Sequence, residues 1–232
     1  FVAKTGQTTA IIGGTGSGKT TLVNLIPRFF DVTKGKVMVD GTDIREMSQE
    51  SLREAIGYVP QKGVLFSGTI DSNLRYGNED ATKEQVMDAA RIAQAKEIID
   101  GKKDGLDSAI AQGGSNVSGG QKQRFSIARA IVKDPKIYIF DDSFSALDYK
   151  TDAILRRELS MKTKEAAVII VAQRISTILH AEQIIVLNEG KIAGIGTHQE
   201  LFDHCAVYRE IAESQLSEAD IAKLKAQGKE VM

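Results

Sequence analysis

The feature that most restricts how this chain can fold is a glycine-rich turn between an apolar run and a helical pattern. Thr8–Ile12 predicts a buried strand, Gly13–Thr20 is the turn, and Thr20–Ile26 predicts a helix that Pro27 should end or kink. The turn fits the pattern G-x-x-x-x-G-K-[ST]. Its glycines let backbone N–H groups curl around phosphates, and the start of the helix adds positive potential. We therefore predict a phosphate-binding loop within a strand–turn–helix unit.

Side chains of this loop suit a nucleotide bound with magnesium. Lys19 can reach the β- and γ-phosphates, and the Thr20 hydroxyl can bind Mg²⁺. Asp141 ends the apolar strand pattern that starts at Ile137, as expected of a carboxylate on the Mg²⁺ side of a neighbouring parallel strand. The residues of the loop predicted to contact the nucleotide are Gly13, Gly14, Thr15, Gly16, Ser17, Gly18, Lys19, Thr20 and Thr21. Together the two motifs predict that the chain binds a nucleoside triphosphate.

Strand and helix patterns alternate along the chain, which favours an α/β fold. Lys36–Val39 with the turn Asp40-Gly41 adds a hairpin signal, so we expect an antiparallel β part beside the core. Further strands are predicted at Ile56–Val59, Lys136–Phe140, Ala167–Ala172, Gln183–Asn188 and Lys191–Ile195. The sequence therefore predicts a P-loop NTPase core with an antiparallel β subdomain.

The middle of the chain, about residues 66–132, has few β-branched runs and long helical patterns. Lys83–Ala93 is one of these, and Thr82 and Gln85 have capping-box spacing at its start. Lys122–Val132 is another. We predict that this stretch is a helical subdomain inserted into the core.

The C-terminal part predicts helices. Thr197 and Glu200 have the spacing of a second capping box, and the polar tail after Tyr208 is helix-prone. We expect a peripheral C-terminal helix over about residues 206–232. The whole chain, residues 1–232, is predicted to be a single domain.

Composition excludes several classes of protein. The 232 residues carry 30 Lys and Arg against 31 Asp and Glu, so no excess of positive charge favours nucleic acid as a partner. One cysteine, Cys205, rules out a disulfide scaffold and suits a reducing compartment. The longest strongly apolar run, Ala166–Ala172, has seven residues against the roughly 20 needed to span a bilayer. A membrane role therefore requires a segment or partner outside this chain.

A third motif resembles one known family. Val117 is followed by Ser118, Gly119, Gly120 and Gln121 just before a helical pattern, and the ATP-binding cassette (ABC) family usually reads Leu-Ser-Gly-Gly-Gln there. Val117 keeps the apolar anchor. The resemblance implies that Ser118 and the glycine backbone present a helix start to the γ-phosphate of a nucleotide held by an opposing subunit.

Other positions of the family pattern follow in order. Gln61, after Tyr58-Val59-Pro60, matches the glutamine loop that reaches Mg²⁺. Ser145–Asp148 matches the loop that crosses the dimer interface. Val64–Ile70 looks like the exporter-type segment that receives transmembrane coupling helices. The resemblance covers nearly the whole chain and implies the ABC ATPase fold, with Thr20, Gln61 and Asp141 as Mg²⁺ ligands.

Two departures from the family concern hydrolysis. Asp142 stands where the family has the glutamate that polarises the attacking water, and its carboxylate is drawn back by roughly 1–1.5 Å. Gln173 stands where the family has a switch histidine, and a glutamine can donate a hydrogen bond but cannot carry positive charge. Both changes should weaken turnover rather than binding. The pair resembles the degenerate half of heterodimeric multidrug exporters.

The resemblance implies a function, with ATP and Mg²⁺ as cofactors. We expect an ATPase domain of an exporter that binds MgATP at a head-to-tail dimer interface. Its partners would be a second, Glu-bearing nucleotide-binding domain and the coupling helices of a transmembrane domain, so it would lie at the cytoplasmic face of the membrane. Lys19, Gln61, Asp142 and Gln173 are the candidate catalytic residues. Nothing before Thr8 supplies the family's adenine-stacking aromatic residue, so we expect that an N-terminal segment of the domain precedes Phe1.

Three alternatives stay open. The chain could form an active homodimer in which Asp142 suffices as the base. It could be a soluble cassette ATPase that acts on DNA or in translation, although the Leu65–Ile70 segment disfavours this. It could also be a regulatory module that binds ATP without hydrolysing it.

Overall fold

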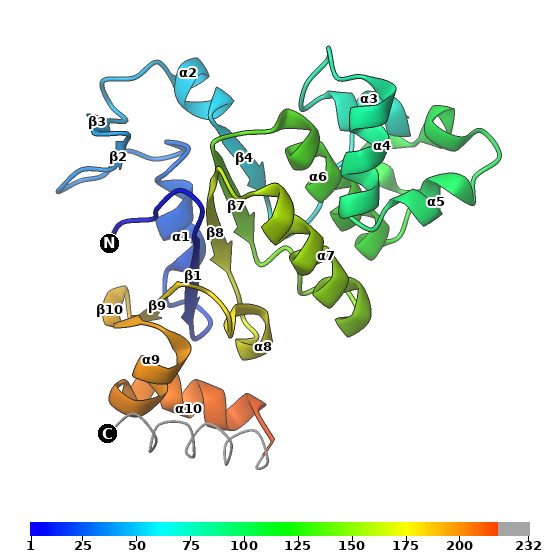
Figure 1. Ribbon diagram of the computed structural model, residues 1–232. Helices are drawn as coiled ribbons and strands as arrows, with labels where there is room; N and C mark the ends of the chain where they lie inside the picture. Colours follow the sequence, from blue (N-terminus) through cyan, green and yellow to red (C-terminus); the bar gives the residue numbers. More distant parts are fainter. Residues whose placement is uncertain (218–232) are drawn as a thin grey trace.

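A six-stranded sheet forms the centre of the computed structural model, which describes residues 1–217 (Figure 1). The strand order is β10-β9-β1-β8-β7-β4, and only β10 runs antiparallel to its neighbour. The strands are β1 (Thr8–Gly13), β4 (Ile56–Val59), β7 (Ile137–Asp141), β8 (Ala167–Val171), β9 (Gln183–Asn188) and β10 (Lys191–Gly196). Each matches a predicted strand to within one residue at either end. The predicted α/β class is confirmed.

Helices cover both faces of this sheet, and successive strand residues point to opposite faces. Ile11 belongs to the cluster that α1 and α2 cover, whereas Ala10 and Ile12 belong to the cluster on the other face. Because both faces are covered, β8 is buried at every position, as expected of an inner parallel strand. The helices are α1 (Lys19–Asn24), α2 (Gln49–Glu54), α3 (Ile70–Arg75), α4 (Lys83–Ile92), α5 (Lys96–Asp100), α6 (Gly119–Lys133), α7 (Tyr149–Lys162), α8 (Ile175–Ile178), α9 (His198–His204) and α10 (Ala206–Gln215).

The helix after the glycine-rich turn is shorter than predicted. It starts at Lys19 and ends at Asn24, and turns continue as far as Arg28. The prediction that it extends to Ile26 was therefore wrong. Two i→i+3 backbone bonds, from Leu25 N to Leu22 O and from Ile26 N to Val23 O, tighten the last turn before Pro27.

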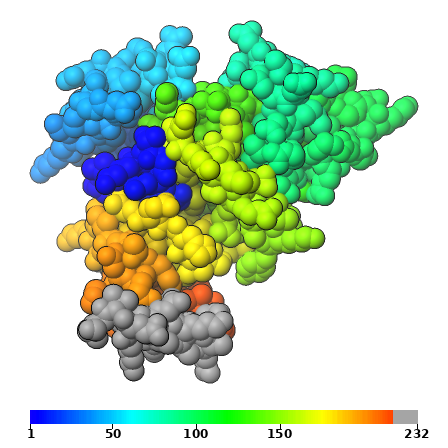
Figure 2. Space-filling model, viewed as in Figure 1, coloured from blue at the N-terminus to red at the C-terminus, as the bar shows by residue number. Residues whose placement is uncertain are grey.

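Helices α3 to α6 form a lobe at one side of the sheet, which Figures 1 and 2 show in green. The long helix α6 packs against α3, α4 and β4, so it joins the lobe to the sheet. The capping box of Thr82 and Gln85 is present at the start of α4. A two-residue strand pair not predicted from the sequence joins β5 (Gly68–Thr69), just before α3, to β6 (Ala109–Ile110), after α5. The limits of a helical subdomain at about 66–132 stay a prediction.

The antiparallel part is small. β2 (Met38–Val39) pairs with β3 (Thr42–Asp43) through the predicted turn, whose residues Asp40 and Gly41 have φ of 48° and 81°. Two consecutive positive φ values are typical of the type I′ hairpin turn. The strand predicted from Lys36 begins only at Met38.

The capping box of Thr197 and Glu200 starts α9, as predicted. The predicted C-terminal helix is present as α10 from Ala206 to Gln215, and its further part at 218–232 lies outside the described residues. Tyr208 and Ala212 are fully buried, so one face of the described part of this helix packs against the core, and the peripheral position of the helix stays a prediction. Among residues 1–217, no helix has both the length and the apolar character needed to cross a membrane.

Candidate nucleotide-binding site

One edge of the sheet gathers most of the predicted site residues. Strands β1, β4, β7 and β8 run parallel, so their carboxyl ends lie at the same edge. Gly13 and Asp141 are the last residues of β1 and β7, Asp142 follows Asp141, and the loops after β4 and β8 carry Gln61 and Gln173. Ligands of open α/β sheets bind outside the carboxyl ends of the strands. The edge is therefore the candidate site.

The glycine-rich loop lies close to β9. A Cβ atom built on Gly13 would be 2.1 Å from the carbonyl oxygen of Leu187, so only glycine fits at this position. Gly18 is the N-cap of α1 with φ of 97°, and no side chain of residues 1–217 caps the helix. The first backbone N–H groups of α1 are thus free of a side-chain cap, which leaves them available to an anion.

Lys19 lies across this loop. Its Nζ donates to the carbonyl oxygens of Gly13 and Gly14, each over 2.8 Å. Burial lowers the pKa of Lys19, and the nearby carboxylates of Asp142 and Asp141 oppose that shift. The ammonium group is therefore held where the loop turns, by acceptors that a phosphate oxygen can replace.

Oxygen atoms suited to Mg²⁺ lie beside the loop. The Thr20 hydroxyl donates to Asp141 Oδ1 over 3.1 Å, and Asp141 is only 2% exposed. Burial raises the pKa of Asp141, whereas hydrogen bonds from Thr20 and Tyr58 lower it. Gln61, in the loop after β4, is the third predicted ligand, and its amide Nε2 faces Asp142. A hydroxyl, a carboxylate and an amide oxygen fit the preference of Mg²⁺ for oxygen ligands.

Asp142 has the left-handed backbone conformation, with φ of 49°. Its Oδ2 accepts hydrogen bonds from Gln61 Nε2 over 3.0 Å and from Gln173 Nε2 over 2.6 Å. Burial raises the pKa of Asp142, and the Gln61 hydrogen bond lowers it. The structure thus brings three of the four predicted catalytic residues into direct contact. Both amides donate to the same carboxylate oxygen.

The Ser118–Gln121 motif forms the start of α6. Ser118 is the N-cap, its hydroxyl accepts from Gln121 N over 3.3 Å, and Gln121 Oε1 accepts from Ser118 N over 3.1 Å. This reciprocal pair is a capping box. Within residues 1–217, no hydrogen bond joins this motif to the Gly13–Thr20 loop. No described residue lies within 4 Å of a Cβ atom built on Gly119, and one built on Gly120 would lie 3.4 Å from the carbonyl oxygen of Ala146.

Three residues with a place in the site were not predicted. Tyr58 OH donates to Asn24 Oδ1 over 3.0 Å and lies 3.4 Å from Asp141 Oδ2. Arg174 Nη2 donates to the carbonyl oxygen of Ser145 over 3.3 Å. Gln215, at the end of α10, contacts the loop that carries Gln173. Tyr58 within a strand pattern and Arg174 after Gln173 are visible in the sequence, but neither has a distinctive spacing that marks a site residue.

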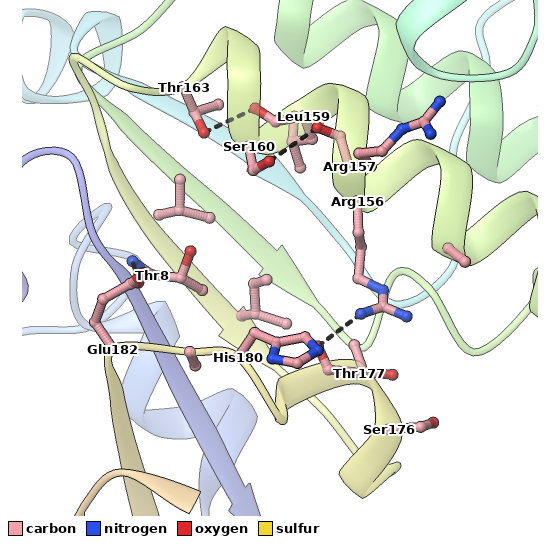
Figure 3. Close-up of a pocket in the computed structure, with 14 residues that line it drawn as sticks. Thr8, Arg156, Arg157, Leu159, Ser160, Thr163, Ser176, Thr177, His180 and Glu182 are labelled. Atoms are coloured by element: carbon pink, nitrogen blue, oxygen red, sulfur yellow. Dashed lines mark hydrogen bonds between the residues drawn. The ribbon is translucent and has the colours of Figure 1, made fainter.

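Two hollows lie away from the phosphate loop. One, of about 290 Å³, lies between β4 and the α3–α6 lobe and has aromatic and cationic walls. These walls include Phe29, Arg53, Phe66, Tyr76, Arg129 and Lys133. The other, of about 590 Å³, lies under α7 at the amino ends of β1 and β8 (Figure 3). Its Arg156 already pairs with Asp152, and its position at the amino ends of the strands is not that of a nucleotide site.

Comparisons with known proteins agree with this geometry. Residues 1–145 match the family described as ABC transporter. An uncharacterized ABC transporter ATP-binding protein of Mycobacterium tuberculosis is 50% identical over 224 residues, which cover 95% of this chain and 38% of that protein. A Bacillus subtilis protein provisionally named a multidrug export ATP-binding/permease protein is 44% identical over 206 residues, which cover 89% of this chain and 36% of that protein.

A solved structure matches as well. A bacterial Atm1-family ABC exporter with ATP bound has a TM-score of 0.90 at 38% identity, and the match covers 94% of this chain and 38% of that one. The chain therefore spans well under half the length of the proteins that it resembles.

Proposed function

Because this chain belongs to the ABC transporter family, we propose that it is the ATP-binding domain of an exporter and binds MgATP at a head-to-tail interface between two such domains. The observation that carries the proposal is the division of the chemistry. Lys19, Thr20 and Asp141 lie together at one sheet edge, whereas the Ser118 motif starts a different helix and has no hydrogen bond to the phosphate loop within residues 1–217. A motif separated in this way is available to a nucleotide bound by another subunit.

On its own nucleotide, this chain supplies phosphate and metal contacts. The uncapped start of α1 and the Lys19 ammonium hold the phosphates. Thr20, Gln61 and Asp141 would hold Mg²⁺, which neutralises charge on the phosphate oxygens when it is bound. When the nucleotide binds, the Lys19 ammonium group would exchange its hydrogen bonds to Gly13 O and Gly14 O for bonds to phosphate oxygens.

We further propose that hydrolysis at this site is slow. Gln173 directs its amide at Asp142 over 2.6 Å, and a neutral amide cannot stabilise transition-state charge as an imidazolium does. The Asp142 side chain is one methylene shorter than the glutamate of the family, so its carboxylate lies farther from the attacking water. Two amide groups also donate hydrogen bonds to this carboxylate. The site would bind ATP and turn it over poorly, while the Ser118 motif completes the competent site of a Glu-bearing partner domain.

The partner assignment is tested at the signature. Ser118→Arg should leave MgATP affinity of this chain within about twofold, because Ser118 has no hydrogen bond to its own phosphate loop within the described residues. It should reduce ATP hydrolysis of the assembled complex by at least about 100-fold, since a donor to the partner's phosphate is lost and a bulky side chain enters the interface. Ser115→Arg, at an exposed position just before the motif, is the matched control and should keep activity. Loss of ATP binding by Ser118→Arg in the isolated chain would contradict the composite site.

The transmembrane part would dock in the hollow of about 290 Å³ beside β4. Exposed Phe66 and Tyr76 offer apolar contact there, and Phe66 belongs to the exporter-type segment Val64–Ile70. Arg129 donates to the carbonyl oxygens of Val64 and Asn73 and lies over the Phe66 ring, so it fixes one wall. This arrangement would place the domain at the cytoplasmic face of a membrane.

A further inference from the structure

A side chain of the C-terminal helix holds the loop that carries Gln173. Gln215, the last residue of α10, bridges two backbone groups of that loop. Its Nε2 donates to the carbonyl oxygen of Gln173 over 2.8 Å, and its Oε1 accepts from the N–H of Ile175 over 2.9 Å. One amide therefore spans the connection between β8 and α8, which are 40 residues or more from it in sequence.

The bridge also supplies a missing helix cap. Ile175 is the first residue of α8, and the N-cap residue, Arg174, makes no side-chain hydrogen bond to the helix. The N–H groups at a helix start have no partner within the helix. Gln215 provides that partner from a different helix, so the start of α8 depends on the position of α10.

Helix α10 is fixed to the rest of the domain by buried side chains. Tyr208 and Ala212 are fully buried, and the Tyr208 hydroxyl lies 2.6 Å from Nδ1 of His198 in α9. The helix packs against α9, α8, β1 and β9, and α8 lies between β8 and α10 (Figure 1). A shift of α10 against the sheet would therefore move the Gln173 loop with it.

The same loop is held from its other side. Arg174 donates to the carbonyl oxygen of Ser145, and its guanidinium lies 5.2 Å from the centre of the Tyr149 ring. Ser145 begins the loop that we assign to the dimer interface. The backbone of Gln173 is thus fixed between α10 and that interface loop, while its side chain reaches Asp142.

We propose that Gln215 is a positioning residue for ATP turnover. It fixes the backbone at position 173, so that the side chain there reaches Asp142. Turnover would therefore depend on the position of α10 relative to the sheet. This inference rests on the proposed ATP-dependent function of the site. Both bonds of Gln215 involve backbone groups, so the bridge does not depend on which side chain occupies position 173.

Gln215→Glu isolates the bridge. The carboxylate still accepts from Ile175 N, but it cannot donate to the Gln173 carbonyl and repels it. At pH 8 we expect kcat of the full chain to fall about two- to tenfold, the effect of one lost hydrogen bond, with MgATP affinity unchanged. Lowering the pH from 8 to 5 protonates part of the new carboxyl group and restores a donor, so the ratio of variant to wild-type kcat should rise. Ser214→Ala, which loses only a local bond to Ile211 O, is the control.

The assay is run in the wild-type chain and in an Asp142→Glu plus Gln173→His background, so that a slow native site does not hide the effect. Identical kcat values for Gln215→Glu and Ser214→Ala at every pH, or a loss independent of pH, would overturn the proposal. Hydrogen exchange gives a second readout. Gln215→Ala should speed exchange of the Ile175 amide, and unchanged exchange overturns the bridge whatever the activity. Suppose that Gln215→Ala speeds exchange of the Ile175 amide but ATP is hydrolysed neither by the wild-type chain nor by the Asp142→Glu plus Gln173→His variant. The bridge then exists, but its link to turnover is refuted, and the absence of hydrolysis separately refutes the ATPase proposal.

Discussion

Restoring the family's two catalytic side chains should activate hydrolysis at this site. The perturbation is Asp142→Glu together with Gln173→His. In the native structure Asp142 Oδ2 accepts from both Gln61 and Gln173, the latter over only 2.6 Å. Replacing Gln173 removes one of these donors and provides an imidazole that can carry charge. Lengthening residue 142 moves its carboxylate outward by roughly 1–1.5 Å.

The expected gain follows from these two displacements. A misplacement of about 1 Å costs on the order of 100-fold in rate, and loss of one preorganised donor to developing charge costs about 100- to 1,000-fold. The two effects act on one transition state and are not additive, so we take 100-fold as the lower expectation for the double variant. Each single variant should gain less than the pair.

Single-turnover MgATP hydrolysis by the domain, without a partner and at a concentration that permits dimers, measures this gain. The Lys19→Ala change placed in the double variant should abolish it and so excludes a contaminating ATPase. Brisk wild-type turnover that the double change barely alters would refute the reasoning. In that case Asp142 is an adequate base, and the chain is an active homodimeric ATPase.

Three further predictions concern the phosphate loop and its carboxylate. Lys19→Ala should weaken MgATP binding of this chain by about 10- to 100-fold in a binding titration, since charge-assisted bonds to phosphate are lost; unchanged affinity would contradict the loop assignment. Gly13→Ala should abolish binding or folding because its Cβ would lie 2.1 Å from Leu187 O, whereas Gly14→Ala, with open space, should leave the melting temperature within about 1 °C. Burial raises the pKa of Asp141, so its contribution to stability is lost as pH rises through the raised value. Asp141→Asn should therefore raise the melting temperature without ligand by roughly 2–4 °C at pH 7.5, less at pH 4, and remove Mg²⁺-dependent binding; a fall at pH 7.5 would reverse the argument.

The elements that could be predicted from the sequence are those determined by a few neighbouring residues. The capping boxes that start α4 and α9 need only a Thr and an acceptor three residues later. The inner strand β8 is apolar throughout because both of its faces are covered. The hairpin turn at Asp40-Gly41 is similarly local.

The features that could not be predicted depend on distant partners. The pair β5–β6 has two residues a side and joins positions some 40 residues apart, so no periodicity marks it. Gln215 is an exposed polar residue at the end of a helix that buries Tyr208 and Ala212, and its role arises because α10 ends beside α8. The motifs predicted that Asp142, Gln61 and Gln173 belong to one site. They did not predict that both amides donate to the same carboxylate oxygen of Asp142.

The capping box at Ser118 has a consequence for the choice of residue. A hydroxyl has one proton and two lone pairs. The cap uses a lone pair, through the bond from Gln121 N, and within residues 1–217 the hydroxyl donates no hydrogen bond. A phosphate brought to this end of α6 would accept a hydrogen bond from the hydroxyl while the helix stays capped, so the helix would need no rearrangement between its free and engaged states. Aspartate and asparagine cap helices equally well, but aspartate would repel the phosphate, and asparagine would have to use its amide rather than the capping oxygen. Serine is one of the few residues whose side chain can cap a helix start and donate a hydrogen bond to an anion through the same oxygen atom.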